Sequence, residues 1–350
     1  QPAEVPLEIG GDWYDVVPLL EHGRIGIVVG DCVGSGLIAA VVMGQLRSSC
    51  RALLLRGAGP GQLLDELDAL ARRTPGAACT TVCAAILEPG TGELIYSSAG
   101  HPPAYVCDPD GRVTVLDEGR SLPLATFDCS PRPEAKIRLA PGSTLVLFTD
   151  GLVERRHVPL DAGLALASAV LTASCGQPVD EVADQILAGL APDSGYDDDV
   201  AMVVYRCPPA PFRLDIDAIP TELARVRAAL REWLASASVA GTRADDIVCA
   251  VNELCTNSIE HAYGAHSDGA ANVHVAGIVA AAEVHIEVTD AGTWVERESD
   301  RSGLRGRGLP MARAMVDDLT IAAGESGTTV RLRARLVPSS EPVAAPTRAS

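Results

Sequence analysis

The sequence predicts an α/β protein of two domains, and three observations support this prediction. Its 350 residues exceed a single typical domain and fit two. Before residue 207, strand-length apolar runs alternate with two pairs of helical patterns, which indicates a layered sandwich. After residue 211 the order of strands and helices changes, which indicates a second, differently patterned α/β domain.

The strands of the first half are short apolar runs bounded by turn residues. Turn signals at 88–93 and 108–112 separate neighbouring runs, as hairpins require. The expected strands are RIGIVVGD (24–31), TTVCAAILE (80–88), GELIYSSAG (92–100), AYVCD (104–108), RVTVLD (112–117), STLVLFTD (143–150) and DVAMVVYR (199–206). Apolar residues that repeat with a helical period predict helices at 36–57, 60–73, 161–173 and 178–190.

The second half follows the proline-rich stretch CPPAP at 207–211, which is the expected linker because prolines interrupt ladders and helices. We expect domains at 1–206 and 212–338, and a disordered Pro/Ala/Ser-rich tail at 339–350. The second domain should contain, in order, a strand at 212–217, helices at 221–237 and 242–263, strands at 272–279 and 283–290, a short helix from Leu309 and two closing strands.

The composition argues against several classes of protein. A net charge of −18 argues against a nucleic-acid partner, because such binding needs a basic face. No apolar segment approaches the length of a membrane span, so we expect a cytoplasmic protein. The ten cysteines form no C-x-x-C pair, which indicates neither a disulfide framework nor a zinc knuckle. The chain starts at Gln1 with no signal-peptide pattern, so we expect a fragment with further sequence upstream.

Four aspartates of the first half share one context, the end or edge of an apolar strand. They are Asp12, Asp31, Asp150 and Asp198. A single aspartate there is best interpreted as a turn residue. Four that converge at one sheet core would repel one another in a low dielectric unless cations neutralise them. Oxygen ligands without a nearby His or Cys cluster favour Mg²⁺ or Mn²⁺, and a pair of such ions can clamp a phosphoryl group for in-line attack.

The motifs GGDWYD, GDCVGSG, YSSAGHPPAYV, LFTDGLVE and DDDVAMVV occur in this order across residues 10–206. Together they resemble the metal-dependent PPM protein phosphatases of the stage II sporulation E-like branch. The resemblance implies an α-β-β-α sandwich with two Mn²⁺ or Mg²⁺ ions and no covalent phosphoenzyme. It implies that the metal ligands are Asp12, Asp31, the Cys32 carbonyl, Asp150 and Asp198.

Two departures from this family pattern bear on function. Ser35 stands where the family usually has the histidine of G-H-G, so we expect a weakened phosphatase. The strand that the family has upstream of Gly10 is expected to be incomplete, at a cost in stability. Asp15 and Asp199 are neighbours of the expected ligands and their roles stay open. His101 beside two prolines is expected to be structural rather than a general acid.

The second half carries a different set of polar motifs. Glu253 and Asn257 are four residues apart and therefore lie on one helical face. Asp290 ends an alternating strand, and the glycine-rich GLRGRGLP runs into a helix N-terminus, where backbone N–H groups and the helix dipole favour phosphate. The loop lacks the G-K-[ST] of a Walker motif and does not follow a first strand as a dinucleotide fingerprint does.

This set resembles the GHKL ATPase superfamily, most closely the anti-sigma-factor serine kinases, over residues 212–336. The resemblance implies a two-layer α/β domain that binds ATP with Mg²⁺. It implies that Asn257 coordinates Mg²⁺, that Asp290 contacts the adenine amine, and that Glu253 is the general base. The residues expected to line the nucleotide are Gly292, Gly306, Gly308 and Thr329.

These resemblances imply a bifunctional regulator. One half would remove phosphate from a serine or threonine of an anti-sigma-factor antagonist, and the other would add it from ATP or bind a sigma factor directly. Such opposed activities suggest a sensory domain upstream of Gln1. Two alternatives stay open. In the first, one half is a binding switch and not a catalyst, and Ser35 makes the phosphatase half the better candidate. In the second, the chain is a sensor histidine kinase. A homodimer also stays open as the oligomeric state.

Overall fold

The computed structural model of this chain divides into two compact units, residues 1–207 and 208–350. It describes residues 10–19, 23–127, 130–155, 158–192, 195–196, 198–237, 239, 241–262, 271–280, 283–292, 308–324 and 327–336. Each unit has its own hydrophobic cores, and each is described here by itself.

The first unit contains a six-stranded sheet in the order β1-β2-β3-β4-β7, with β8 also paired to β4. Its strands are β1 (Trp13–Leu19), β2 (Arg24–Asp31), β3 (Thr81–Glu88), β4 (Glu93–Ala99), β7 (Arg120–Ser121) and β8 (Ala135–Arg138). All of these pairs are antiparallel except that of β4 with β7. Asp31 is the last residue of β2, opposite Thr81, so the strand delivers it to the sheet end.

A second, four-stranded sheet has the order β10-β9-β5-β6. Its strands are β5 (Ala104–Cys107), β6 (Val113–Leu116), β9 (Thr144–Phe148) and β10 (Met202–Arg206). The inward side chains of the two sheets form one core, in which Ile27, Val29 and Leu94 of the first sheet join Leu145 and Leu147 of the second. The sheets therefore stack face to face.

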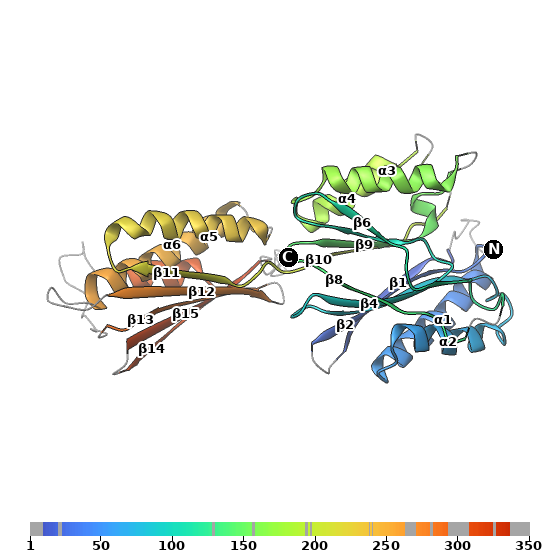
Figure 1. The fold of residues 1–350 in the computed structure, drawn as a ribbon, viewed down its shortest axis with the longest axis horizontal. Coiled ribbons are helices and arrows are strands. Elements are labelled where there is room, and N and C mark those ends of the chain that lie inside the picture. Colours follow the sequence, from blue (N-terminus) through green and yellow to red (C-terminus); the bar gives the residue numbers. More distant parts are fainter. Residues whose placement is uncertain are drawn as a thin grey trace, which may run out of the picture. The chain divides into compact units, whose positions relative to one another are not determined.

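Helix pairs cover the outer faces of this sandwich (Figure 1). The helices α1 (Leu37–Leu55) and α2 (Pro60–Ala71) share a core with the first sheet. The helices α3 (Leu160–Ala173) and α4 (Val179–Leu190) share a core with the second sheet, which includes Tyr105 and Phe148. The α-β-β-α sandwich expected from the sequence is confirmed.

Helix α1 corrects one expectation. It has 19 residues and an 18-residue window of mean hydropathy 1.3, so its length and composition alone would allow it to cross a membrane. No other helix among the described residues is both long enough and apolar enough for this. Val42, Leu46 and Cys50 on its inner face belong to the core, and Arg51 Nε donates to Asp15 Oδ2 at 2.8 Å. These contacts are those of a core helix, although only 28% of the window is buried.

The second unit is a five-stranded antiparallel sheet in the order β11-β12-β13-β15-β14, with helices on one face (Figure 1). Its strands are β11 (Phe212–Asp217), β12 (Asn272–Ala280), β13 (Glu283–Asp290), β14 (Asp318–Gly324) and β15 (Gly327–Arg335). Its helices are α5 (Leu223–Ser236), α6 (Gly241–Asn257) and α7 (Gly308–Met315), and a π-helical turn, Ser258–Ala262, follows α6. Leu230, Leu254 and Ala312 pack on Val275 and Ile286, so the expected two-layer α/β domain is also confirmed.

Candidate active sites

The threonine that precedes Asp150 holds one end of the first site together. Thr149 follows β9 and is fully buried. Its Oγ1 donates to Asp12 Oδ2 at 2.6 Å and accepts from the Ala201 N–H at 2.8 Å. This one hydroxyl therefore fixes the Asp12 carboxylate beside the segment that leads into β10. Asp150 is the next residue and opens a short 3₁₀ helix, Asp150–Leu152.

Glycines let the remaining segments of this site approach one another closely. A Cβ on Gly11 would lie 2.3 Å from the Cys32 carbonyl oxygen, and the Cys32 N–H donates to the Gly11 carbonyl at 3.3 Å. A Cβ on Gly151 would lie 2.0 Å from the Asp199 carbonyl oxygen and 3.4 Å from the Asp198 Cβ. A larger residue at either position would clash with this backbone, so the segments that carry Asp12 and Asp31 lie close together, as do those that carry Asp150 and Asp198.

The carboxylates of this cluster perturb one another. Burial, a hydrogen bond with Asp12 and the charges of Asp12, Asp150 and Asp198 together raise the pKa of Asp31 to about 8, and burial has the largest effect. Burial also raises the pKa of Asp12 to about 6, despite hydrogen bonds from Thr149 and Asp31 that lower it. The pKa of Asp150 is raised by burial and by the charges of Glu154 and Asp198. These acids lack a positive partner: within the described ranges no Arg or Lys forms a salt bridge with any of the four.

The chemistry of this donor set fits a hard divalent cation. The four side chains offer only oxygen, and the cost of their charges in a partly buried site is the cost that Mg²⁺ or Mn²⁺ removes. The described residues contain no group of three His, Cys, Asp or Glu side chains that already surround one point. Asp12 and Asp31 instead lie close enough for each carboxyl group to shift the pKa of the other. We interpret the two carboxyl groups as sharing a proton, at a position where a bound cation would replace that proton.

Two polar residues near this cluster have structural roles. Asp15 is 3% exposed and pairs with Arg51 of α1, so it points away from the carboxylate cluster into the helix interface. His101 is 1% exposed, and its Nδ1 shares a 2.8 Å hydrogen bond with Thr81 Oγ1. Burial lowers the pKa of His101 to about 3, which keeps the ring neutral near pH 7. A neutral, buried ring is no proton donor to a substrate, in line with the structural role expected for it.

The second candidate site lies where α6, its π-turn and β13 meet. Asp290 is 5% exposed; its Oδ2 accepts from Ser258 Oγ at 2.7 Å and its Oδ1 accepts from the Gly292 N–H at 3.0 Å. Glu253 and Asn257 face the start of α7, because a Cβ on Gly308 would lie 2.5 Å from Glu253 Oε2 and 3.9 Å from Asn257 Oδ1. A π-turn directly after Asn257 is a feature often found at functional sites.

The strand register places the two closing threonines on opposite faces of the sheet. Asp290 is paired with Thr328, and both are buried on the helix-covered face. Thr329, expected to line the nucleotide, alternates to the other face, where its Oγ1 lies 3.4 Å from Thr289 Oγ1. The threonine on the Asp290 face is therefore Thr328, whose buried hydroxyl has no partner among the described residues. Gly306 lies outside the described residues.

Sequence reasoning missed Thr149, Ser258 and Thr328 as members of these sites. Each stands beside an expected site residue, but only the fold shows which neighbour points the same way. For Thr328 the signal is register, because the pairing of β13 with β15 decides which threonine shares a face with Asp290.

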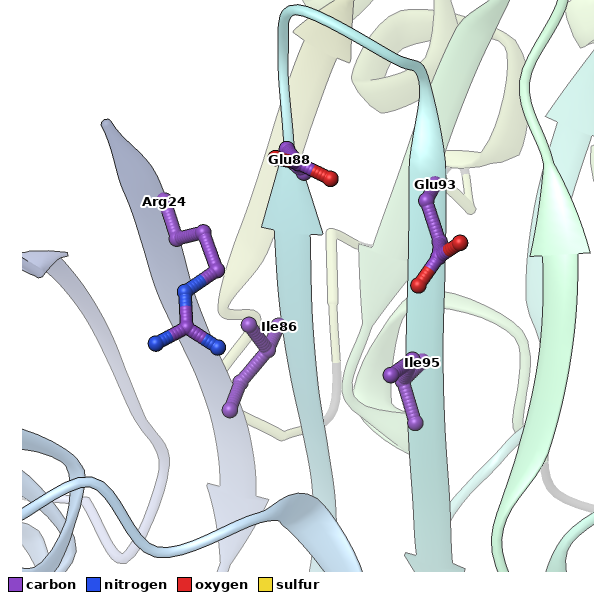
Figure 2. Close-up of a pocket in the computed structure, with 5 residues that line it drawn as sticks. All are labelled: Arg24, Ile86, Glu88, Glu93 and Ile95. Carbon is purple, nitrogen blue, oxygen red and sulfur yellow. The ribbon is translucent and has the colours of Figure 1, made fainter. Parts of the chain in front are cut away.

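Two pockets among the described residues lie away from both sites. A pocket of about 220 Å³ at the far end of β2 is lined by Arg24, Ile86, Glu88, Glu93 and Ile95, drawn in Figure 2. Arg24 and Asp31 mark opposite ends of that strand. A second pocket of about 460 Å³ includes His285 and Arg331, which alternate with the residues on the Asp290 face. Neither pocket contains an expected site residue, so the carboxylate contacts define the first site better than concavity does.

Comparison with known proteins agrees with this division of the chain. Residues 21–208 match the family model of stage II sporulation protein E, and residues 216–334 match the histidine kinase-like ATPase domain. Phosphoserine phosphatase RsbP of Bacillus subtilis is 28% identical over 153 residues, which are 42% of this chain and 37% of RsbP. Phosphoserine phosphatase RsbU of the same organism is 27% identical over 166 residues, which are 44% of this chain and 49% of RsbU. The matches thus span half or less of these curated relatives.

A solved structure is similar over both units. The structure of the RsbU and RsbW domains of Rv1364c from Mycobacterium tuberculosis is 32% identical with a TM-score of 0.58. The match covers 95% of this chain and 90% of that one. The chain therefore belongs to the stage II sporulation protein E family of PP2C-type phosphatase domains, here followed by a histidine kinase-like ATPase domain.

Proposed function

We propose that the first unit is a metal-dependent phosphatase for phosphoserine or phosphothreonine in a protein, and that the second is an ATP-dependent kinase for the same site. The observation on which this rests most is the cluster of Asp12, Asp31, Asp150 and Asp198, in which burial and neighbouring acids raise the pKa of Asp12, Asp31 and Asp150. The similarity to RsbP and RsbU, which are phosphoserine phosphatases, supports the choice of reaction.

In the phosphatase unit, the protein's own residues provide a rigid ligand frame. Asp12, Asp31, Asp150 and Asp198, with the Cys32 carbonyl, would hold two Mn²⁺ or Mg²⁺ ions. When bound, these ions supply Lewis acidity that activates water and offsets phosphoryl charge. Thr149 keeps Asp12 oriented by its 2.6 Å hydrogen bond, and Gly11 and Gly151 allow the ligand segments to approach. His101, neutral and buried, takes no part in proton transfer.

In the kinase unit, the proposed roles divide between α6 and β13. Ser258 and the Gly292 N–H fix the Asp290 carboxylate, which keeps free lone pairs to accept from the adenine amino group. Asn257 would hold Mg²⁺, and Glu253 would accept the proton of the substrate hydroxyl as its oxygen attacks the γ-phosphorus. Gly308 and Thr328 are expected to approach the nucleotide, together with Gly306.

The proposed partner of both units is an anti-sigma-factor antagonist, and a sigma factor is the second partner of the kinase unit. The similarity to a chain with RsbU and RsbW domains supports one pathway for both units. A sensor histidine kinase is disfavoured, because β10 ends at Arg206 and β11 starts at Phe212, so no helix pair stands directly before the ATPase unit.

The test is to incubate the chain with serine-phosphorylated candidate antagonist proteins and to measure phosphate release with Mn²⁺, with Asp31→Asn as the control. Release by the wild type and none by the variant is expected. Release that persists in Asp31→Asn refutes the carboxylate site. No Mn²⁺-dependent release from any candidate favours the alternative in which the phosphatase half is a binding switch, consistent with Ser35 in place of the usual histidine.

A further inference from the structure

An uncharged and exposed apolar surface adjoins the carboxylate cluster. Residues 32–46 contain no charged side chain, although 21% of the whole chain is charged. Val33, Leu37, Ile38 and Val41 are 59%, 73%, 75% and 53% exposed, and we call these four residues the α1 apolar patch. Aliphatic side chains gathered in this way on a surface mark an interaction site more often than chance exposure does.

The position of the patch determines what can reach it. Val33 is two residues from Asp31, and the turn at 33–36 leads directly into α1. The Cys32 N–H is tied to the Gly11 carbonyl, so the start of the turn is fixed against the metal-ligand frame. The turn and the first residues of α1 are therefore the surface that follows Asp31 directly along the chain, where a protein whose phosphorylated side chain enters the cluster can make contact.

We infer that the α1 apolar patch is the docking surface for the phosphoprotein substrate, which contacts it with apolar residues that flank the phosphorylated serine or threonine. This inference rests on the proposed phosphatase function. It separates two parts of substrate recognition: the carboxylate cluster with its cations binds the phosphate, and the patch binds the protein that carries it.

Other occupants fit the patch less well. Four aliphatic side chains present on the order of a few hundred Å² of surface, below the roughly 800 Å² per partner that a standard stable interface buries. This area suits a partner that must leave after each turnover rather than a permanent second copy. An anionic membrane surface is disfavoured, because the chain carries a net charge of −18.

The test compares two substrates and two positions on the same helix. Leu37→Gln/Ile38→Gln removes the patch while keeping good helix formers. Leu55→Gln is the matched control, because Leu55 is 58% exposed on α1 but lies about 25 Å from Ile38 at 1.5 Å per residue. The substrates are p-nitrophenyl phosphate, which has no protein surface, and the antagonist protein that loses phosphate in the experiment above.

We expect the double variant to raise the KM for the phosphoprotein by roughly tenfold or more, since two aliphatic contacts are lost. Its Mn²⁺-dependent hydrolysis of p-nitrophenyl phosphate should stay within about twofold of the wild type, and Leu55→Gln should alter neither reaction. Thermal melting of both variants checks that the fold is kept.

Several outcomes overturn the inference. Unchanged phosphoprotein kinetics, or equal losses on both substrates, would show that the patch has no role in docking. If the wild type is a dimer in ultracentrifugation and the double variant is a monomer, the occupant of the patch is a second copy of the chain. If the wild type binds phosphatidylglycerol vesicles and the double variant does not, the occupant of the patch is a membrane surface. A wild type that hydrolyses neither substrate with Mn²⁺ refutes the proposed function itself, and the docking inference falls with it.

Discussion

At the scale of single residues, Asp31 shows how a functional group costs stability. Its pKa is raised from 3.8 to about 8, first by burial and then by Asp12 and the charges around it. Between these two values the folded, metal-free protein must keep a proton that the unfolded chain has released. The unfolded state therefore binds fewer protons, and the contribution of Asp31 to stability falls as the pH rises through this window.

We predict that Asp31→Asn stabilises the metal-free protein while it abolishes phosphatase activity. In EDTA the free energy of unfolding should rise by about 0.5–2 kcal/mol, with a gain that grows toward pH 8. The Mn²⁺-dependent rate should fall by roughly 100-fold or more, beyond the 10–100-fold typical of outer-shell partners. Denaturant unfolding at pH 5 and pH 8 measures the first effect. A less stable variant at pH 8 would contradict this account of the cluster.

Gly308 provides a test of the second site. We predict that Gly308→Ala displaces the Glu253 carboxylate, because the new Cβ would lie 2.5 Å from Glu253 Oε2. Phosphorylation of the antagonist should slow by about tenfold or more, with a smaller change in the affinity for ATP. Gly324→Ala is the matched control, since a Cβ there meets nothing within 4 Å. Equal rates for the two variants would show that Gly308 and Glu253 are not neighbours in the working enzyme.

Residue types at the sites follow from the sequence better than residue directions do. The aspartates can be identified from the sequence because each lies near an end of a strand, and Asp31 and Asp290 are the last residues of β2 and β13. The choice between Thr328 and Thr329 depends on how β15 pairs with β13, which no property of either threonine encodes. The direction of the Asp15 side chain is likewise not readable from the sequence, because its hydrogen bond from Arg51 depends on the packing of α1 on β1.

At the scale of elements, a buried ion-pair network ties α2 to the segment around β7. Asp68 Oδ1 accepts from Arg132 at 2.6 Å and from the Ala125 N–H at 2.8 Å, and its Oδ2 accepts from Arg72 at 2.7 Å. Arg132 also donates to Ser121 Oγ, and its side chain is 1% exposed. This network therefore adds polar contacts between α2 and the segment at 121–132 to the apolar packing of α2.

We predict that Asp68→Asn destabilises the first unit by on the order of 3 kcal/mol, since Arg132 is left buried without its partner. Burial raises the pKa of Asp68, but the hydrogen bonds from Ala125, Arg132 and Arg72 together lower it below 3.8. Its contribution to stability is therefore fully present above the unfolded pKa and lost as the pH falls through the folded one.

Melting of the wild type and Asp68→Asn between pH 7 and pH 3 tests this assignment. The difference in melting temperature between the two proteins should be constant from pH 7 to about pH 5 and should shrink below about pH 4. Asp184→Asn, an exposed substitution on α4, is the control and should melt as the wild type does. A difference that is independent of pH would show that the charge of Asp68 is not what stabilises the network.

The long elements follow from periodicity, and the short ones do not. The helical patterns at 36–57 and 178–190 become α1 and α4 within two residues at each end. The strands β1, β7 and β8 were not expected. β7 has two residues and β8 has four, too few to show alternation. In the seven-residue β1 the exposed Tyr14 and Val16 are apolar while the buried Asp15 is charged, which hides the alternation. The expected helix at 242–263 changes to a π-turn at Ser258, where the Ser258 hydroxyl reaches Asp290, a contact absent from any local pattern.

At the scale of the whole molecule, the chain joins two proposed activities that oppose each other on one substrate. We predict that, with ATP, Mg²⁺ and Mn²⁺ present, Asp31→Asn drives the antagonist protein toward full phosphorylation and Glu253→Gln drives it toward full dephosphorylation. Each variant removes one direction of the cycle and leaves the other intact. Phosphate-affinity gels over time measure the steady state. Identical steady states for the two variants would rule out opposed activities on that protein.

The Thr149 hydrogen bonds also determine when the phosphatase can first act during synthesis. They connect residues 137 and 52 positions apart along the chain, and Asp198 is contributed only near the end of the first unit. The proposed ligand set, which includes Asp198, is therefore complete only once a ribosome has released nearly all of that unit. Partial chains of the first unit would have some of these aspartates but not the complete proposed site, so we expect a truncated product to have no phosphatase activity.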